Sequence, residues 1–341
     1  MKINKKTIAS IVLGLTTATF AVWQLATAAD LNSAASTLPQ NEEWSIMARA
    51  SLNQVSGTEY LRSPLNSSSA TDYEKRILAI TALGQNPETW GNENFVSRLK
   101  SFYDGNQIGD PQLLNDDVFG VLALFSAGER GEIINRVSQH IRNHQNNDGG
   151  WGFATDIGSD SNTTAMAVAA LKLTGSVPQS AINYLLTTQD GSGGFRFDYS
   201  NSADGASTAW VIMGLRAAGA TIPNNAVTFL DSLQLSNGSF KWSPSDTSGS
   251  PLVTAYAIIA LSSKTLPINI LNPNPTPPPA PLPPPPAPQP PPAPLPPPPA
   301  PLPPPPPIVP PPLPPPPPAP LPPPPFPPPP ISGFTVSINH P

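Results

Sequence analysis

Two adjacent aspartates, Asp116 and Asp117, are the residues of this chain best suited to acid–base chemistry. A buried carboxyl group whose pKa is raised by its surroundings can donate a proton to a substrate. The same pair stands at the start of a helical pattern, where it could instead cap the helix and face its dipole. Asp116 and Asp117 are therefore candidate catalytic acids, with a capping role as the alternative.

Other kinds of catalytic or metal site find little support in the sequence. The chain contains no cysteine, which excludes disulfides, thiolate metal ligands and a thiol nucleophile. His140 and His144 could share a metal ion, but no HExxH glutamate accompanies them, so a solvated helix face is the simpler interpretation. No glycine-rich phosphate loop, Ser-His-Asp arrangement or dinucleotide fingerprint is present. We expect no cofactor and no bound metal.

The elements that must position these residues form a repeat. The pattern Gln-x-x-x-Gly-x-aromatic occurs at 145–151, 189–195 and 234–240, and its glutamines lie 44 and 45 residues apart. A period in this range, with helical patterns on both sides, indicates a repeat architecture. We interpret the motif as structural: the glutamine satisfies carbonyls at a helix end, the glycine permits a tight turn, and the aromatic ring packs between repeats.

Each repeat combines a helix that is apolar on most sides with an amphipathic helix. Residues 177–189 show the second type, because Ile182, Leu185 and Leu186 form a single stripe. Apolar helices are expected at 43–55, 73–84, 116–128, 161–175, 207–219 and 251–263, and amphipathic ones at 93–105, 131–145, 177–189 and 222–234, with a short one near 58–63. Six inner helices are enough to close a ring. We predict an all-α fold, an (α/α)6-type toroid without a last outer helix, and an open solenoid is the competing geometry.

On these residues the chain resembles the terpene cyclase and protein prenyltransferase superfamily. The Gln-x-x-x-Gly-x-aromatic copies look like the glutamine–tryptophan motif of squalene cyclases. The segments that begin at Thr163, Ser207 and Val253 look like the Thr-Ala helices of the same toroids. The resemblance covers about 42–267 and is strongest after Asp116. Cobalamin-carrier proteins share this toroid and use it only for binding, so the function must be argued from the site.

The resemblance implies a ligand cavity at one end of the inner barrel, lined by the N-termini of the inner helices and the loops before them. On this basis the candidate ligand-binding residues are Trp151, Asp160, Thr164, Asp204, Thr208 and Tyr256. Class II cyclases also carry an Asp-x-Asp-Asp box that protonates an alkene. Here Asp116 and Asp117 match its last two acids, but Leu114 holds the first position, and a second copy at Asp160 lacks both central acids. The prenyltransferase zinc site needs a cysteine, which this chain lacks.

Two parts of the chain are not expected to be globular. Lys2, Lys5 and Lys6 precede the uncharged residues 7–29, which include an A-x-A site at 26–28, and this is typical of a signal peptide. An uncleaved membrane anchor is the alternative. Of 52 prolines, 43 lie in 272–341, which predicts a disordered polyproline II spacer. We divide the chain into 1–29 signal peptide or anchor, 30–41 linker, 42–267 toroid, 268–330 proline-rich spacer, and 331–341 short tail, interpreted as part of a truncated module.

The net charge of the chain and its predicted export signal limit the classes of molecule that it could bind. The formal charge of −5 becomes −8 when the three lysines of the signal are removed, which leaves 14 basic and 22 acidic residues. This balance argues against nucleic acid and anionic membrane surfaces as partners. The export signal and the spacer predict a bacterial envelope protein, secreted or tethered to the membrane through residues 7–29.

These features favour a noncatalytic module that binds a hydrophobic small molecule or a cell-surface component. The first alternative is a terpene cyclase-like or prenyl-transferring enzyme that acts on a polyprenoid, which would need Asp116 or Asp117 in a deep apolar pocket. The second is an activity directed at cell-wall glycans through aromatic and acidic residues at the rim of the toroid.

Overall fold

Eleven α-helices and one 3₁₀ helix make up residues 28–273, the part of the chain that the computed structural model describes. They are α1 (Leu31–Ser36), α2 (Glu43–Ser51), η1 (Glu59–Arg62), α3 (Ala70–Ala82), α4 (Phe95–Lys100), α5 (Leu114–Ser126), α6 (Glu132–Asn143), α7 (Ser161–Thr174), α8 (Gln179–Thr187), α9 (Gly205–Ala218), α10 (Asn224–Ser232) and α11 (Pro251–Leu261). The predicted signal peptide or anchor, most of the spacer and the final tail lie outside the described residues.

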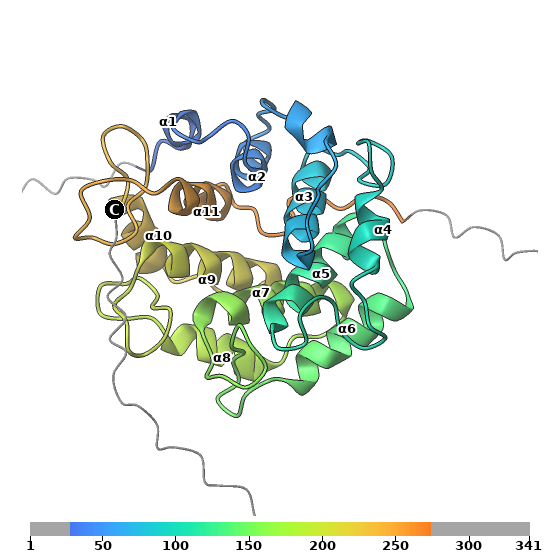
Figure 1. The fold of residues 1–341 in the computed structure, drawn as a ribbon. Coiled ribbons are helices and arrows are strands. Elements are labelled where there is room, and N and C mark those ends of the chain that lie inside the picture. Colours follow the sequence, from blue (N-terminus) through green and yellow to red (C-terminus); the bar gives the residue numbers. More distant parts are fainter. Residues whose placement is uncertain (1–27, 274–341) are drawn as a thin grey trace, which may run out of the picture. The chain divides into compact units, whose positions relative to one another are not determined.

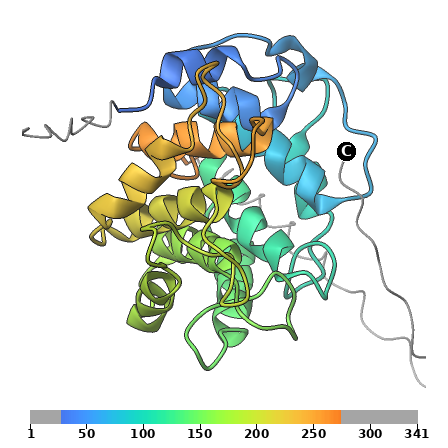
Figure 2. The same cartoon turned by 90° about the vertical axis from the view of Figure 1, so that its left-hand side faces the viewer.

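Six of these helices form a closed inner ring. The helices α2, α3, α5, α7, α9 and α11 each pack against the next, and α11 packs against α2. Figure 1 shows the chain running around the ring from blue to orange, and Figure 2 shows α11 beside the blue N-terminal helices. The all-α toroid predicted from the repeats is therefore confirmed, and the ring is closed rather than open.

The outer layer is complete within the described residues, and it includes one helix that we did not predict. The helices α4, α6, α8 and α10 lie outside α3, α5, α7 and α9, and η1 packs on α3. The place outside α11 and α2 is filled by α1, which lies in the segment that we expected to be a linker. The six residues of α1 are too few to show a helical period, and the helix depends on the Asp30 cap and on packing.

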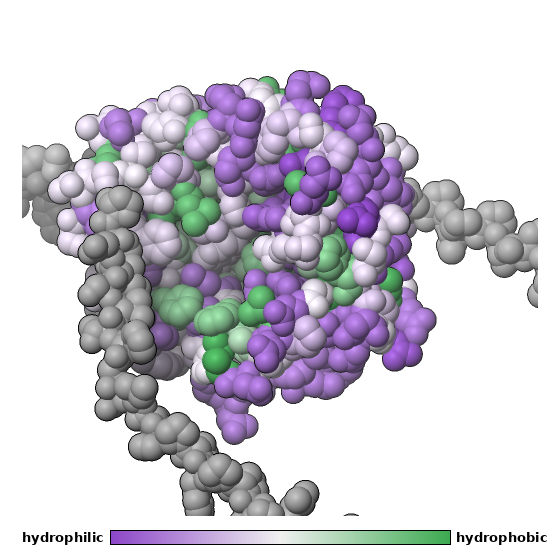
Figure 3. Space-filling view, in the orientation of Figure 1, coloured by the Kyte–Doolittle hydropathy of each residue, from purple (hydrophilic) through white to green (hydrophobic). Residues whose placement is uncertain are grey.

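Side-chain size explains how the inner helices approach one another. In α9 every residue from Gly205 to Leu215 is buried. A Cβ atom at Gly214 would lie 2.7 Å from the Cβ atom of Ala165 in α7, so glycine allows the two helices to touch. The outer helix α6 instead buries only one stripe that includes Ile134, Val137 and Ile141. Its other side contributes to the hydrophilic surface at the lower right of Figure 3.

The Gln-x-x-x-Gly-x-aromatic motif joins successive outer helices. In each copy the glutamine Nε2 donates to the carbonyl of the motif glycine, at 2.7, 2.8 and 2.9 Å. The same atom donates to the start of the next outer helix, at Ser180 Oγ, Asn225 Oδ1 or Asp30 O. The structural interpretation is confirmed, but the carbonyl that is satisfied belongs to the turn and not to the helix end.

The end of the toroid also differs from the prediction. We placed the boundary at residue 267, but the Leu271 N–H donates to the Ser126 carbonyl at 2.8 Å and Ile268 packs on the core. The first residues of the predicted spacer therefore belong to the folded unit. Within residues 28–273, no helix is both long and apolar enough to cross a membrane.

Candidate functional site

A cavity of about 250 Å³ lies inside the ring, near the N-terminal ends of the inner helices. All six inner helices contribute to its wall. The lining residues are Trp44, Thr71, Lys75, Asn115, Val118, Phe119, Asn162, Thr163, Met166, Trp210 and Tyr256. We call this cavity the aromatic pit.

The repeat itself builds the pit. The sixth residue of α3, α5, α7, α9 and α11 points to the same place, and these residues are Lys75, Phe119, Met166, Trp210 and Tyr256. Because the helices are arranged around one axis, equivalent positions converge at the centre. Most of these positions are apolar, and α3 alone among the five places a charged residue there.

The aromatic rings of the pit pack edge to face. The Trp44 ring lies 5.0 Å from Tyr256 at 90° and 5.6 Å from Trp210 at 81°, measured between ring centroids. The Trp210 and Tyr256 rings lie 4.5 Å apart at 49°, and Phe119 lies 6.2 Å from Trp44 and from Trp210. These arrangements are favourable for aromatic pairs. Burial raises the pKa of Tyr256, so its hydroxyl stays neutral.

Three polar groups of the pit can only donate hydrogen bonds: the Nε1 atoms of Trp44 and Trp210 and the Lys75 ammonium. Among the described residues, the Nε1 atoms of Trp44 and Trp210 and the hydroxyl of Tyr256 have no hydrogen-bond partner, yet none is sealed away from solvent. The Lys75 ammonium lies 3.1 Å from Asp72 Oδ1 at the rim. Neither a carboxylate nor an imidazole belongs to the lining residues.

Asp116 and Asp117 do not line the pit. Asp116 accepts a hydrogen bond from Thr71 Oγ1 at 3.0 Å and another from the Asp110 N–H at 3.1 Å. The residue borders a separate hollow of about 510 Å³ formed by Ser68–Thr71, Phe102 and the 109–113 loop. Burial raises the pKa of Asp116 above its usual value.

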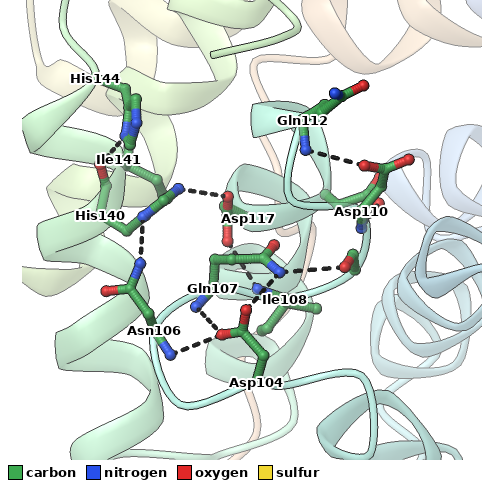
Figure 4. Close-up of polar contacts among 12 residues, drawn as sticks. Asp104, Asn106, Gln107, Ile108, Asp110, Gln112, Asp117, His140, Ile141 and His144 are labelled. Carbon is green, nitrogen blue, oxygen red and sulfur yellow. Dashed lines mark hydrogen bonds and ion pairs between the residues drawn. The ribbon is translucent and has the colours of Figure 1, made fainter. Parts of the chain in front are cut away.

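Asp117 connects α5 to the preceding loop and to α6. Its Oδ1 accepts a hydrogen bond from the Ile108 N–H at 2.9 Å, and its Oδ2 lies 3.5 Å from His140 Nε2 (Figure 4). Burial raises the pKa of Asp117 to about 8 and lowers the pKa of His140. The pair is therefore a neutral carboxyl–imidazole contact at pH 7. Both aspartates lie in the first turn of α5, but their partners are N–H groups of the loop, so the predicted helix cap is not the role observed.

A third carboxyl group lies beside this pair. Glu74 of α3 is fully buried, and neither of its side-chain oxygens has a hydrogen-bond partner. Burial and the neighbouring Asp116 and Asp117 raise its pKa well above the usual value. The three acids thus form a buried cluster between α3 and α5, outside the pit.

Comparison of the repeats shows what Asp117 does. In α7, α9 and α11 the fourth residue is a threonine, and its hydroxyl accepts the backbone N–H of the motif aromatic, at 2.8 to 2.9 Å. These pairs are Thr164 with Trp151, Thr208 with Phe195 and Thr254 with Phe240. Asp117 is the fourth residue of α5 and accepts the Ile108 N–H in the same way. We call each of these contacts an inner joint.

Five of the six predicted ligand-binding residues make structural hydrogen bonds, either in an inner joint or as a helix cap. Trp151 is fully buried and donates its Nε1–H to the Ile141 carbonyl, and Thr164 and Thr208 are inner-joint residues. Asp160 and Asp204 cap α7 and α9 by accepting the N–H groups of Thr163 and Ser207. Burial raises the pKa of Asp160 to about 6 and that of Asp204 above its usual value. Of the six, only Tyr256 lines the pit.

Sequence reasoning missed most of the pit. Trp44, Lys75, Phe119, Met166 and Trp210 were not named, although a signal was available. In each Thr-Ala segment the residue after the alanine points inward: Met166, Trp210 and Tyr256 follow Thr-Ala in the same way. A search for the inward-facing position of the repeat would have found them.

The histidine pair lies outside the pit as well. The rings of His140 and His144 are 4.3 Å apart, His140 Nδ1 contacts Asn106 Nδ2 at 2.8 Å, and His144 Nδ1 bonds to the His140 carbonyl. Figure 4 shows both side chains on α6, facing the 104–112 loop. Across the described part of the chain, no group of three or more His, Asp or Glu side chains is placed to hold a metal ion.

Comparisons with known proteins agree with this architecture. The family model of the squalene-hopene cyclase N-terminal domain matches residues 121–182, from within α5 into α8. The Candida albicans protein geranylgeranyltransferase-I, solved with GGPP, is similar in structure with a TM-score of 0.52 at 14% identity, over 72% of this chain and 96% of that one. None of the curated proteins matches the chain.

Two further solved structures have TM-scores below 0.5. One is a type II terpene cyclase from Scytonema in complex with geranylgeranyl dihydroxybenzoate, at 0.48 and 13% identity, over 68% of this chain and 95% of that one. The other is an unsaturated glucuronyl hydrolase specific for heparin, at 0.49 and 10% identity, over 68% and 93%. The likeness to the geranylgeranyltransferase shows the fold of the described residues, an α/α toroid, and the family model shows a similarity to squalene-hopene cyclases within residues 121–182.

Proposed function

We propose that this toroid is a noncatalytic binding module of an exported bacterial chain, and that its aromatic pit holds a small hydrophobic molecule or the hydrophobic end of a larger one. The observation that carries the proposal is the wall of the pit. It presents rings from α2, α5, α9 and α11 and one lysine, with no carboxylate or imidazole. Apolar walls with a few polar groups are typical of small-molecule sites.

The positions of the acids support a binding role over proton-transfer chemistry. A general acid must lie within hydrogen-bond reach of the group that it protonates. Asp117 is directed to Ile108 and His140, and Asp116 to Thr71 and the Asp110 N–H. Their raised pKa values follow from burial in an inter-helix contact, which is a common structural cause of such shifts.

The volume of the pit limits the ligand. Sites for drug-sized molecules measure about 300–1,000 Å³, and the pit measures about 250 Å³. A ligand of one or two fused rings would fill it, whereas a long polyprenoid would leave most of its length outside. A place outside the cytoplasm is supported by the basic, apolar and small-residue segments of the N-terminus and by the proline-rich tail.

Calorimetric titration of the full chain with 2-naphthalenemethanol, a neutral aromatic alcohol, tests the proposal. We expect saturable binding that Met166→Trp weakens at least tenfold, because the larger side chain extends into the pit. Leu186→Trp is the matched control, since Leu186 lies exposed on α8 and adds the same ring away from the pit. Equal binding by wild type and Met166→Trp would show that the pit is not the site.

A second measurement addresses catalysis. Full-length protein incubated with squalene or with a polyprenyl diphosphate is expected to leave the substrate unchanged, as judged by mass spectrometry. Formation of a cyclised or transferred product that is lost in Asp117→Asn would contradict the noncatalytic role and favour the enzyme alternative.

A further inference from the structure

The pit combines a lysine with two indole N–H groups that have no acceptor among the described residues. This combination limits the charge that a ligand can carry. Resting on the proposed function, we propose that the pit takes a small monoanionic carboxylate with a flat apolar body, such as an aromatic carboxylic acid. The carboxylate lies toward Lys75, and the ring system lies among Trp44, Trp210 and Tyr256.

The position of Lys75 is the first observation. It stands at the inward-facing sixth position of its helix, where α5, α7, α9 and α11 carry Phe119, Met166, Trp210 and Tyr256. The Lys75 side chain lines the pit and is also 32% exposed, so its ammonium can meet a ligand that enters from solvent. Asp72 accepts one of the three ammonium donors at 3.1 Å, and the other two have no acceptor in the described protein.

The donor inventory is the second observation. An indole N–H and a lysine ammonium can only donate. Trp44 Nε1 and Trp210 Nε1 lack acceptors among residues 28–273, and the Asn115 side chain makes no hydrogen bond there. No carboxylate among the lining residues offers an acceptor to a ligand. Acceptor oxygens on the ligand would satisfy these groups, and hydrogen bonds to a charged acceptor are the stronger ones.

The charge and the apolar wall of the pit disfavour the other ligand classes. A phosphate carries about −1.5 to −2 at neutral pH, more than one lysine already paired with Asp72 can balance. A cation would be repelled by the Lys75 charge. A sugar carries many hydroxyl groups that need hydrogen-bond partners, but much of the wall consists of apolar and aromatic side chains.

Three probes of one shape test the charge preference: 2-naphthoate, the neutral 2-naphthalenemethanol and the cationic 2-naphthylmethylammonium. In calorimetric titrations of the full chain, we expect the carboxylate to bind at least tenfold more tightly than the alcohol and the ammonium compound to bind most weakly. Lys75→Met should remove the advantage of the carboxylate over the alcohol, whereas Lys75→Arg should keep that advantage.

The matched control is Lys172→Met, which removes a positive charge from the exposed C-terminal turn of the inner helix α7. It should bind all three probes as the wild type does. Circular dichroism melts check that Lys75→Met folds, which we expect because Lys75 is partly exposed and its ion pair contributes little.

The outcomes separate this inference from the proposed function. Equal affinities for the carboxylate and the alcohol, both weakened by Met166→Trp, would overturn the anion preference and leave the pit as a binding site. Preference for the ammonium compound would overturn it as well. Absence of binding by all three probes at millimolar concentration would contradict both.

Discussion

In the half of the ring formed by α7, α9 and α11, threonine hydroxyls anchor the loop in front of each inner helix, whereas in α5 the same place holds the Asp117 carboxyl. The backbone geometry is alike, because every joint is an N–H donated to the fourth helical residue. The chemistry differs, because a hydroxyl stays neutral at any pH and a buried carboxyl must lose a proton to become charged.

The comparison teaches that the acidic cluster is a structural variant of a neutral joint. The acids of the cluster also affect one another. Asp116 raises the pKa of Asp117, and both aspartates raise the pKa of Glu74. Asp117 therefore occupies the place that a threonine hydroxyl takes in α7, α9 and α11, and an acid at this position has a structural explanation.

The largest expected effect comes from removing the aromatic side chain at a threonine inner joint. Trp151→Ala should lower the free energy of unfolding by about 4 kcal/mol, because it removes a fully buried indole and the hydrogen bond from its Nε1. Ile108→Ala, at the Asp117 joint, should cost about 3 kcal/mol. Urea denaturation measures both. Trp242→Ala is the control, since that ring is 46% exposed and should cost under about 0.5 kcal/mol. A larger loss of unfolding free energy in Ile108→Ala than in Trp151→Ala would contradict this order of the two joints.

The next effect separates the joints by pH. The folded pKa of Asp117, about 8, lies above its unfolded value of 3.8, so its contribution to stability is complete below pH 4 and is lost as pH rises through 8. Above pH 7 the His140 imidazole is neutral, because its pKa is lowered, so it does not contribute to the change in stability. Between pH 7 and 8.5 stability should fall, by at most about 1.4 kcal/mol per pH unit for each proton.

Asp117→Asn should flatten this slope and gain about 2 kcal/mol at pH 8.5, because the amide oxygen still accepts the Ile108 N–H without a charge. Thermal melts across this pH range provide the measurement, and Thr164→Ser, which keeps a hydroxyl in its joint, should retain the wild-type slope. An unchanged slope in Asp117→Asn would show that Asp117 is not the titrating group.

A smaller effect is expected at the unpartnered acid. Glu74→Met should stabilise the protein by about 1 kcal/mol at pH 8, because a buried carboxyl without hydrogen bonds is replaced by an apolar side chain of similar volume. The gain should shrink as the pH falls toward the ordinary glutamate pKa of 4.5, because the raised pKa of Glu74 then costs less stability. Destabilisation at both pH values would mean that Glu74 has a partner that the fold requires.

The smallest effect concerns ring closure. Gln189→Ala removes two hydrogen bonds and Gln234→Ala removes three, and each variant should cost about 1 kcal/mol. Only Gln234→Ala should speed amide hydrogen exchange in α1, because Gln234 bonds to both the N–H and the carbonyl of Asp30. Equal exchange in the two variants would show that packing alone holds α1 in the outer layer.

Particular residues show how far sequence reasoning reached. The repeated glutamine, glycine and aromatic predicted the joints between outer helices, and the alternation of apolar and amphipathic segments predicted the inner and outer layers. The helix α1 was missed because six residues carry no detectable period. The sequence could not show that Trp151, Asp160 and Thr164 lie outside the pit, because the hydrogen bonds that hold these side chains join residues of different loops and helices.

The sequence by itself determined the six inner helices, most of the outer ones and their alternation, because periodicity and turn chemistry act over a few residues and repeat along the chain. Closure of the ring depends instead on the contact between α11 and α2, which lie far apart in the sequence. Only the tertiary structure decided which side of each inner helix faces the centre. That choice depends on the packing of six helices at once, and it placed Lys75, Trp210 and Tyr256 in the pit while turning Asp116 and Asp117 away from it.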